Sequence, residues 1–142
     1  MYSALDIAKY VIGYCDYKRY DVSNLKLQKI LYFIQAEFLV TLGVACFKEP
    51  IQAWAFGPVV PQVYQEYKKF ASSNILIDYK MEGILKSEKE EKLVKKIVDQ
   101  CDKYSTSELM RFTQNQGPWL NAYRKYRNNS IRNQDIKSFF EN

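Results

Sequence analysis

Apolar residues recur every three or four positions over residues 22–42, which predicts a long helix at the centre of the protein. This spacing stacks side chains on one helical face, here those of Leu27, Ile30, Leu31, Ile34 and Phe38. Further apolar residues cover the other sides, which is more than a helix on a domain surface carries. We therefore expect a mostly buried helix, with Ser23 as its N-cap and Gly43 as the left-handed residue after its last turn.

The same spacing predicts shorter helices around the central one. Ser3, Ser87 and Ser105 each stand three residues before an acid, which is the spacing of a capping box at a helix start. Pro61 can occupy the first turn of another helix. Together these signals predict helices over 4–17, from 61 to about 70, after Ser87, after Ser105, over 119–126 and over 133–140. In the last of these, Ile136, Phe139 and Phe140 are expected to face inward.

A short segment over residues 51–56 is aromatic and lies between Pro50 and Gly57-Pro58, which favours a strand over a helix. Residues 75–79 are either a second short strand, which would pair with the first, or a loop. The predicted fold is therefore mainly α. We expect a single compact helical domain over residues 1–142, built around the buried central helix, with a minor short β element.

Composition is that of an ordinary globular protein, because 47% of the residues are hydrophobic and 26% are charged. The 12 Tyr and 8 Phe predict an aromatic-rich core or contact surface. Cys15, Cys46 and Cys101 are an odd number of thiols in unrelated contexts, which indicates a reduced protein. The sequence shows neither a signal peptide nor an apolar run of membrane-spanning length. We expect a cytoplasmic protein with no membrane partner.

The usual catalytic and ligand-binding constellations are missing from the sequence. It contains no His, so the common zinc sites and the Ser-His and Cys-His nucleophile pairs are excluded. Its glycines form neither of the common phosphate-binding motifs. Glu88, Glu90 and Glu91 are more typical of a solvated helix start than of a catalytic carboxylate pair. We therefore predict no catalytic residues, no metal ligands, no cofactor and no enzymatic activity.

The net charge of +5 is concentrated near the end of the chain. A single acid, Asp135, accompanies the bases of residues 111–137, which are Arg111, Arg124, Lys125, Arg127, Arg132 and Lys137. Three interpretations stay open: a solvated basic face, a surface that steers an acidic protein partner, and a phosphate-binding surface. No recognition-helix or RNA-binding signature accompanies these bases, so nucleic-acid binding is expected to be weak or absent.

Three stretches together resemble one protein family: SNLKLQKILYFIQA at 23–36, AWAFGPVVPQVYQEYK at 53–68 and SELMRFTQNQGPWLNAY at 107–123. The sequence is similar to the Panacea domain, also described as the SocA-like antitoxin family and often found as a phage-associated protein. The resemblance spans nearly the whole chain in the family's order. Its most specific part is the combination of LKLQKxLYF with WxxGPVxPxVY. The ending around residues 131–140 also resembles the family's final segment.

This resemblance implies a function carried by protein binding. Family members are antitoxins that neutralise toxins encoded beside them, so the expected partner is a cognate toxin bound directly. One alternative is a proteolytic adaptor or prophage interaction protein that delivers a partner to an AAA+ protease. A nucleic-acid-binding regulator is a weaker alternative. Some family members carry an added DNA-binding domain, but this sequence has no room for one.

Two features of these stretches are candidates for binding the partner. Gln28, Tyr32 and Gln35, with Lys29 beside them, form a polar line along the central helix, and a buried polar line needs hydrogen-bond partners. Those partners are either residues 51–60 of the same chain or a bound toxin.

The second feature is the segment around Gly57, which is either a rigid strand-to-helix turn or an aromatic contact surface. The predicted partner-binding residues are Gln28, Lys29, Tyr32, Gln35, Trp54, Phe56, Gly57, Pro58, Val59, Tyr64 and Trp119.

Overall fold

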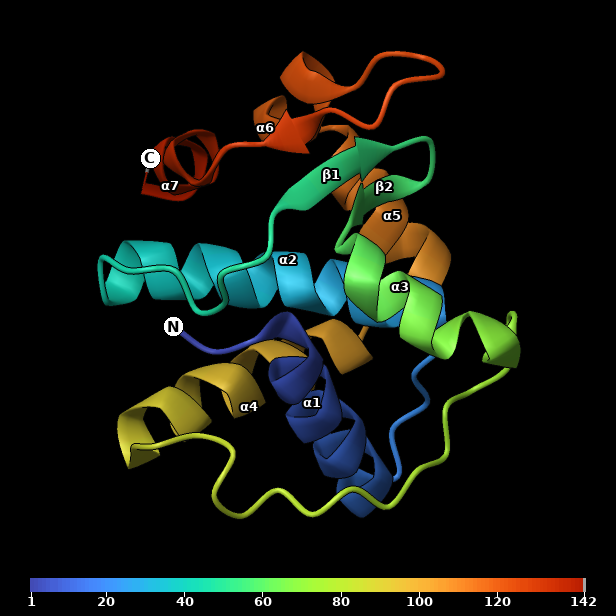
Figure 1. Cartoon of the computed structure of the whole chain (residues 1–142), viewed down its shortest axis with the longest axis vertical. Helices are drawn as coiled ribbons and strands as arrows, with labels where there is room; N and C mark the ends of the chain where they lie inside the picture. The colour runs from blue at the N-terminus through green and yellow to red at the C-terminus, as the bar shows by residue number, and fades with distance from the viewer. Residues whose placement is uncertain (142) are drawn as a thin grey trace.

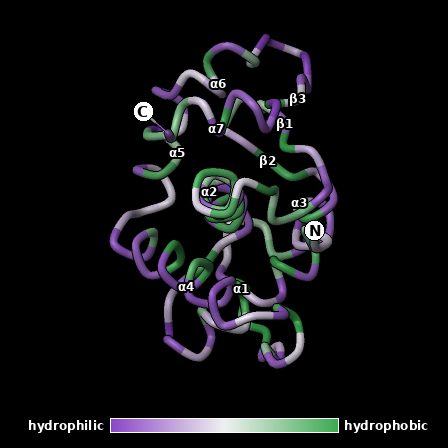
Figure 2. Tube along the Cα trace, turned by 90° about the vertical axis from the view of Figure 1, so that its left-hand side faces the viewer, coloured by the Kyte–Doolittle hydropathy of each residue, from purple (hydrophilic) through white to green (hydrophobic). Residues whose placement is uncertain are grey.

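The computed structural model describes residues 1–141 and places one helix, α2 (Asn24–Thr41), at the centre of the protein. Figure 1 shows α2 crossing the molecule, and Figure 2 looks along its axis, with the other elements arranged around it. The surrounding helices are α1 (Ala4–Lys18), α3 (Pro61–Tyr67), a 3₁₀ turn η1 (Lys68–Phe70), α4 (Glu88–Asp102), α5 (Thr106–Gln114), α6 (Gly117–Ala122) and α7 (Asn133–Glu141). The prediction of a mainly helical fold is confirmed.

Local signals in the sequence account for both ends of α2. The Ser23 side chain accepts a hydrogen bond of 3.2 Å from the Lys26 amide and thus caps the helix. Gly43 adopts the left-handed conformation just beyond the last turn, with a φ of +73°. Leu27, Leu31 and Ile34 are fully buried. The predicted central core helix is therefore confirmed, together with its cap.

Tyrosines of α1 and the following loop bond carboxylates of α4. The Tyr10 hydroxyl donates to Glu91 at 2.9 Å, and the hydroxyls of Tyr14 and Tyr20 both donate to Asp99, at 2.8 and 2.9 Å. The pKa values of Tyr10 and Tyr14 are raised, mainly by burial and to a smaller extent by the hydrogen bond to a carboxylate. Glu91 is thus more than a solvated residue of a helix start: it joins the two helices that cover one side of α2 (Figure 2).

A small antiparallel sheet lies on the other side of α2, with strand order β2-β1-β3. β1 (Ile51–Trp54) turns through residues 55 and 56 into β2 (Gly57–Val59), and β3 (Ser130–Ile131) pairs with the other edge of β1. The partner of β1 is therefore residues 57–59. Sequence patterns hide this strand because it contains Pro58, which a sheet tolerates at an edge.

The alternative that residues 75–79 form a strand is wrong. This segment is extended but belongs to no sheet, and it crosses α1 where Gly13 leaves space. A Cβ at Gly13 would lie 2.5 Å from the Tyr79 carbonyl oxygen. A hydrogen bond of 2.8 Å from the Ile75 amide to the Val22 carbonyl fixes the start of the segment. Its apolar residues therefore pack on a helix, and their short alternation is not a sign of strand pairing.

Two predictions about the last forty residues are also wrong. The helix expected over 119–126 runs from Gly117 and ends at Ala122. Beyond it, Asn129 donates to the Ala122 carbonyl and accepts from the Ala53 amide, which draws the chain back to form β3. In α7, Ile136 is buried as expected, but Phe139 is 40% exposed. Its ring lies beside Gly117 and Pro118 of α6, whereas its partly buried neighbour Phe140 packs on α2.

Candidate functional site

The β1-β2 hairpin is held in place from the α2 side by two predicted site residues. Gln28 accepts a hydrogen bond of 2.9 Å from the Val60 amide and donates to Asn24 at 3.0 Å. The Lys29 ammonium donates to the Pro58 carbonyl at 3.2 Å. For these two side chains, the predicted alternative of partners within residues 51–60 is confirmed.

Side chains of α5 and α6 also bond the hairpin. The Gln114 amide donates to the Ala55 carbonyl at 2.9 Å, and the Trp119 indole donates to the Trp54 carbonyl at 2.8 Å. The bond from Gln114 satisfies a carbonyl of the two-residue loop, which lies outside the strand ladder, and the bond from Trp119 reaches the last residue of β1. The turn is therefore fixed by four side chains from three helices. Gln114 was missed as a site residue because nothing in its local sequence marks it.

The other two members of the predicted polar line bond within the chain but outside residues 51–60, so the partner segment predicted for them is wrong. The Gln35 side chain accepts from the amides of Cys46 and Phe47 and donates to the Phe47 carbonyl, at 2.7, 3.2 and 3.0 Å. Tyr32 donates to the Gln116 side chain at 2.8 Å. Both are buried, as are Gln28 and Lys29. In this conformation the polar line positions the segments that pack on α2.

Lys29 differs from its polar neighbours because its side chain in the interior is ionisable. Its side chain is fully buried, and its Nζ lies 5.5 Å from the centre of the Phe56 ring. Burial lowers the pKa of this ammonium from 10.5 to about 7. Gly57 lies directly above the side chain, with a φ of +106°. Pro58 and Val59 complete this buried part of the hairpin.

Three aromatic side chains project from the hairpin and from α3 and form the accessible part of the site. Trp54, Phe56 and Tyr64 are each half-buried. Their ring centroids are 5.2 Å apart for Trp54 and Tyr64, 5.7 Å for Trp54 and Phe56, and 6.0 Å for Phe56 and Tyr64. We call these three residues the aromatic cluster. Sequence reasoning named all three, and the structure brings them together.

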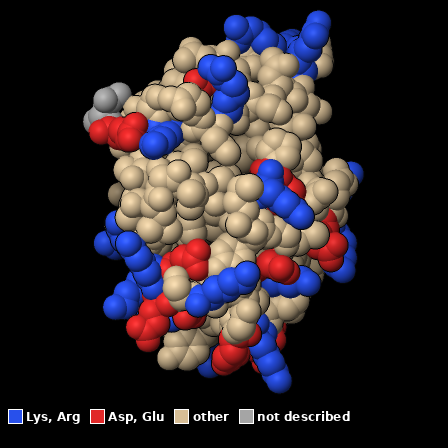
Figure 3. All heavy atoms as spheres, turned by 60° about the vertical axis from the view of Figure 1, so that its left-hand side comes forward, with Lys and Arg blue, Asp and Glu red and all other residues tan. Residues whose placement is uncertain are grey.

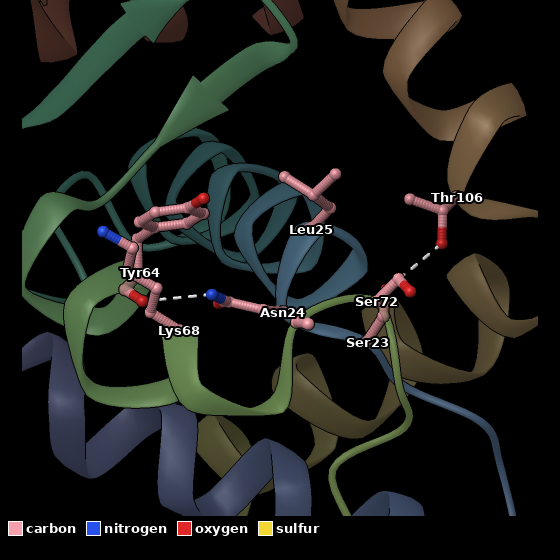
Figure 4. Close-up of a pocket in the computed structure, with 8 residues that line it drawn as sticks. Ser23, Asn24, Leu25, Tyr64, Lys68, Ser72 and Thr106 are labelled. Atoms are coloured by element: carbon pink, nitrogen blue, oxygen red, sulfur yellow. Dashed lines mark hydrogen bonds between the residues drawn. The ribbon is translucent and has the colours of Figure 1, made fainter.

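A cavity of about 340 Å³ lies beside the aromatic cluster, between α2, α3 and the start of α5. Figure 4 shows Tyr64, Leu25 and Lys68 around it, and the two hydrogen bonds that fix its wall. The Asn24 amide donates to the Tyr64 carbonyl at 3.0 Å, and the hydroxyls of Ser23 and Thr106 lie 3.4 Å apart. The cluster and this cavity share Tyr64 and thus form one continuous surface.

A second, more apolar surface lies between α2, α4, α5 and α7 and was not predicted. Two cavities of about 190 and 230 Å³ share Phe33, Ile97 and Gln100 as lining residues. Tyr104 and Phe112, which line the first of them, are 41% and 39% exposed. The signal in the sequence was weak, because single aromatic residues at the ends of amphipathic helices are common on ordinary surfaces.

The bases near the end of the chain do not line any of the three cavities described above. Lysine and arginine side chains project from the upper end of the molecule in Figure 3, over the segment that follows α6, whereas acids and bases mix over the lower end. Arg132 pairs with Asp135 at 3.1 Å, and Arg124 donates to backbone carbonyls of Asn121 and Tyr123. Some of the N–H donors of these arginines are therefore already bonded within the chain.

The ionisable side chains of residues 1–141 include three buried thiols and form no metal-binding group. No group of three or more Cys, Asp or Glu side chains in this part of the chain could hold a metal ion. The three cysteines are free and buried. Burial raises the pKa of the Cys15 and Cys101 thiols to about 12, so these thiols stay protonated and are weak nucleophiles near pH 7. No helix of the described residues is long and apolar enough to cross a membrane.

Comparison with known proteins identifies the class to which this hydrophobic core and hairpin belong. Residues 27–120 match the family model described as "Antitoxin SocA-like, Panacea domain". This range holds most of α2, the hairpin, α3, α4, α5 and the start of α6. The chain therefore belongs to the SocA-like Panacea family, as its motifs predicted.

One curated relative is similar over a shorter range. The chain is 50% identical over 44 residues to Antitoxin SocA of Caulobacter vibrioides (strain NA1000 / CB15N). The match covers 31% of this chain and 23% of that relative, so the chain spans about a quarter of its length. No solved structure matches the chain.

Proposed function

We propose that this protein is an antitoxin that neutralises a cognate toxin by binding it directly, without an enzymatic step, through the aromatic cluster. Membership of the SocA-like Panacea family supports the antitoxin role. The observation that carries the choice of surface is the set of three half-buried aromatic rings on a hairpin fixed by four side chains. We further propose that residues 1–141 act as one unit, because one cluster of buried residues includes members of every helix from α1 to α7.

The geometry suits recognition of another protein for two reasons. Aromatic side chains are enriched among the residues that dominate interface energetics, since they bury a large area with few rotatable bonds. A surface that is already ordered before binding loses less conformational entropy when the complex forms. Gln28, Lys29, Gln114 and Trp119 supply that order, because each bonds the backbone of residues 54–60.

Co-expression with the neighbouring reading frame tests this proposal. If that frame encodes the toxin, its expression alone should arrest growth, and this protein should restore growth and copurify with it. The triple change Trp54→Ala, Phe56→Ala, Tyr64→Ala should abolish rescue and weaken the complex by at least about 100-fold, since interface hot spots cost about 2 kcal/mol or more each. Thermal melting should show that this variant still folds.

The control is the double change Tyr104→Ala, Phe112→Ala on the second apolar surface, where the two rings are 5.1 Å apart and similarly accessible. It should leave rescue and affinity within about twofold of wild type. Loss of binding in the control but not in the cluster variant would place the interface on the second surface. Rescue that disappears in cells lacking AAA+ proteases would instead favour delivery of the toxin for degradation.

A further inference from the structure

Lys29 is a buried ammonium that no carboxylate of the described residues reaches. The ion pairs in this part of the chain, Lys96 with Glu37 and Arg132 with Asp135, do not involve it. A lysine ammonium has three N–H donors. Those of Lys29 have one hydrogen-bond acceptor, the Pro58 carbonyl at 3.2 Å, and the face of the Phe56 ring at 5.5 Å.

This arrangement is poorly suited to a purely structural role. Moving an ammonium into the interior without a counter-ion is costly, and an apolar side chain of similar volume at such a position is often neutral or stabilising. The backbone bond to Pro58 offsets only part of that cost, because it satisfies one of the three N–H donors. Burial lowers the pKa of this ammonium to about 7.

The position of Lys29 beneath the aromatic cluster indicates which group could satisfy its remaining N–H donors. Phe56 is half-buried and forms one wall around the ammonium, and the preceding residue, Ala55, is exposed. Gly57 has no side chain, and a Cβ there would lie 3.3 Å from the ammonium nitrogen. Rotation of the Phe56 ring would therefore bring the donors of Lys29 close to any group bound on the cluster.

We propose that Lys29 receives an Asp or Glu side chain of the toxin, which enters beside Phe56 and forms an ion pair with the buried ammonium. This inference rests on the proposed function, since the acid belongs to the protein that binds the aromatic cluster. The cost of burying the ammonium is then recovered in the complex, where a carboxylate accepts the remaining N–H donors. The toxin surface recognised would carry an acid surrounded by apolar residues.

Proton linkage gives this proposal a distinctive signature. A carboxylate beside the ammonium raises its pKa in the complex above the value of about 7 in the free protein. Below the free value, both states are protonated and affinity is constant. Between the free and the bound values, binding takes up a proton, so affinity falls as pH rises, by up to about tenfold per pH unit.

The experiment compares toxin binding by the wild type and by Lys29→Met at constant ionic strength from pH 6 to pH 9. Wild-type affinity should fall by about tenfold or more between pH 7 and pH 9, whereas the Met variant should bind at least about tenfold more weakly at pH 6 and lack this component of the pH dependence. Titrating groups of the toxin contribute equally to the pH profiles of the wild type and the Met variant, so they cancel when one profile is subtracted from the other. Lys89→Met, which removes an exposed charge on α4, should bind like the wild type.

Equal affinities and pH profiles for the wild type and Lys29→Met would overturn this inference and leave the proposed function intact. Absence of any wild-type complex would instead overturn the proposed function. A loss of affinity in Lys89→Met as large as that in Lys29→Met would show that net charge steers association. That result would also overturn the inference. An independent measurement uses the ¹³Cε resonance of Lys29 in the wild-type complex: its pKa must be higher there than in the free protein, and an unchanged or lower pKa contradicts the inference.

Discussion

The backbone of Gly57 lies against the side chain of Lys29, so closely that a Cβ added to the glycine would be 2.8 Å from Lys29 Cε. The same Cβ would lie 3.0 Å from the Thr113 hydroxyl, which α5 contributes and which bonds the Met110 carbonyl. The hairpin turn is therefore seated on two helices at once. This contact requires glycine both for its φ of +106° and for the space that its missing side chain leaves.

Gly57→Ala should destabilise the protein and disorder the aromatic cluster. A non-glycine residue in a sparsely populated backbone region costs about 1–3 kcal/mol, and the contacts with Lys29 and Thr113 add to that cost. Gly43→Ala is the matched control, because its φ is also positive, at +73°, but nothing lies within 4 Å of the added Cβ. Urea denaturation should show a clearly larger loss for Gly57→Ala. Equal losses would mean that the close approach to Lys29 carries no energetic weight.

Lys29→Met should make the free protein more stable at neutral pH, by about 1–4 kcal/mol, as replacement of buried charges by apolar residues can do. The folded-state pKa of Lys29 lies below its unfolded value of 10.5, so the unfolded state binds more protons between about pH 7 and 10.5. Wild-type stability should consequently rise with pH over this window relative to the variant. Urea titrations at pH 6, 7, 8 and 9 measure the difference.

A second titration affects both proteins above about pH 9 and cancels in the comparison. Above this pH, the thiols of Cys15 and Cys101 ionise in the unfolded state but stay protonated when folded, because burial raises their pKa to about 12. This lowers the stability of both proteins equally. A stability difference between wild type and Lys29→Met that stays constant from pH 6 to pH 9 would contradict the assignment of a lowered pKa to Lys29.

Leu31→Asp should prevent folding, because Leu31 is fully buried in the middle of α2. An unpaired carboxylate in an apolar interior costs several kcal/mol, which is about half the stability of a typical domain. Circular dichroism and thermal melting provide the measurement. Lys89→Ala changes an exposed residue of α4 and should alter stability by less than about 0.5 kcal/mol. A normal cooperative melt for Leu31→Asp would show that α2 is not the core of the protein.

The basic segment after α6 should bind nucleic acid weakly and without sequence preference. Each neutralised phosphate contributes roughly −0.7 to −0.9 to the slope of log K against log salt. Contacts by Arg124, Lys125, Arg127 and Arg132 would together give a slope near −3, and the ion pair of Arg132 with Asp135 makes a smaller value the expectation. Fluorescence anisotropy with DNA and RNA probes measures it. A sub-micromolar, sequence-selective complex at physiological salt, lost when the four are changed to Ala, would favour a regulator.

Features set by local physical chemistry were determined by the sequence. The apolar spacing of α2 is a property of residues a few positions apart, and Ser23, Ser87 and Ser105 each cap the helix that follows them. At Ser105 the complete capping box forms with Glu108. The motif residues Trp54, Phe56 and Tyr64 could likewise be named in advance, because a glycine and two prolines mark a rigid turn near them.

The other features of the fold and the site depend on tertiary contacts, because the residues that make these contacts lie far apart in the sequence. β2 exists because residues 57–59 meet β1, and α6 ends early because Asn129 joins Ala122 to the sheet. Residues 75–79 form no strand because Gly13 lets them pack on α1. The sequence showed a lysine on a helix rich in apolar residues. That its ammonium lies beneath an aromatic cluster, away from any carboxylate of the described residues, follows from how α2, α5 and the hairpin pack together.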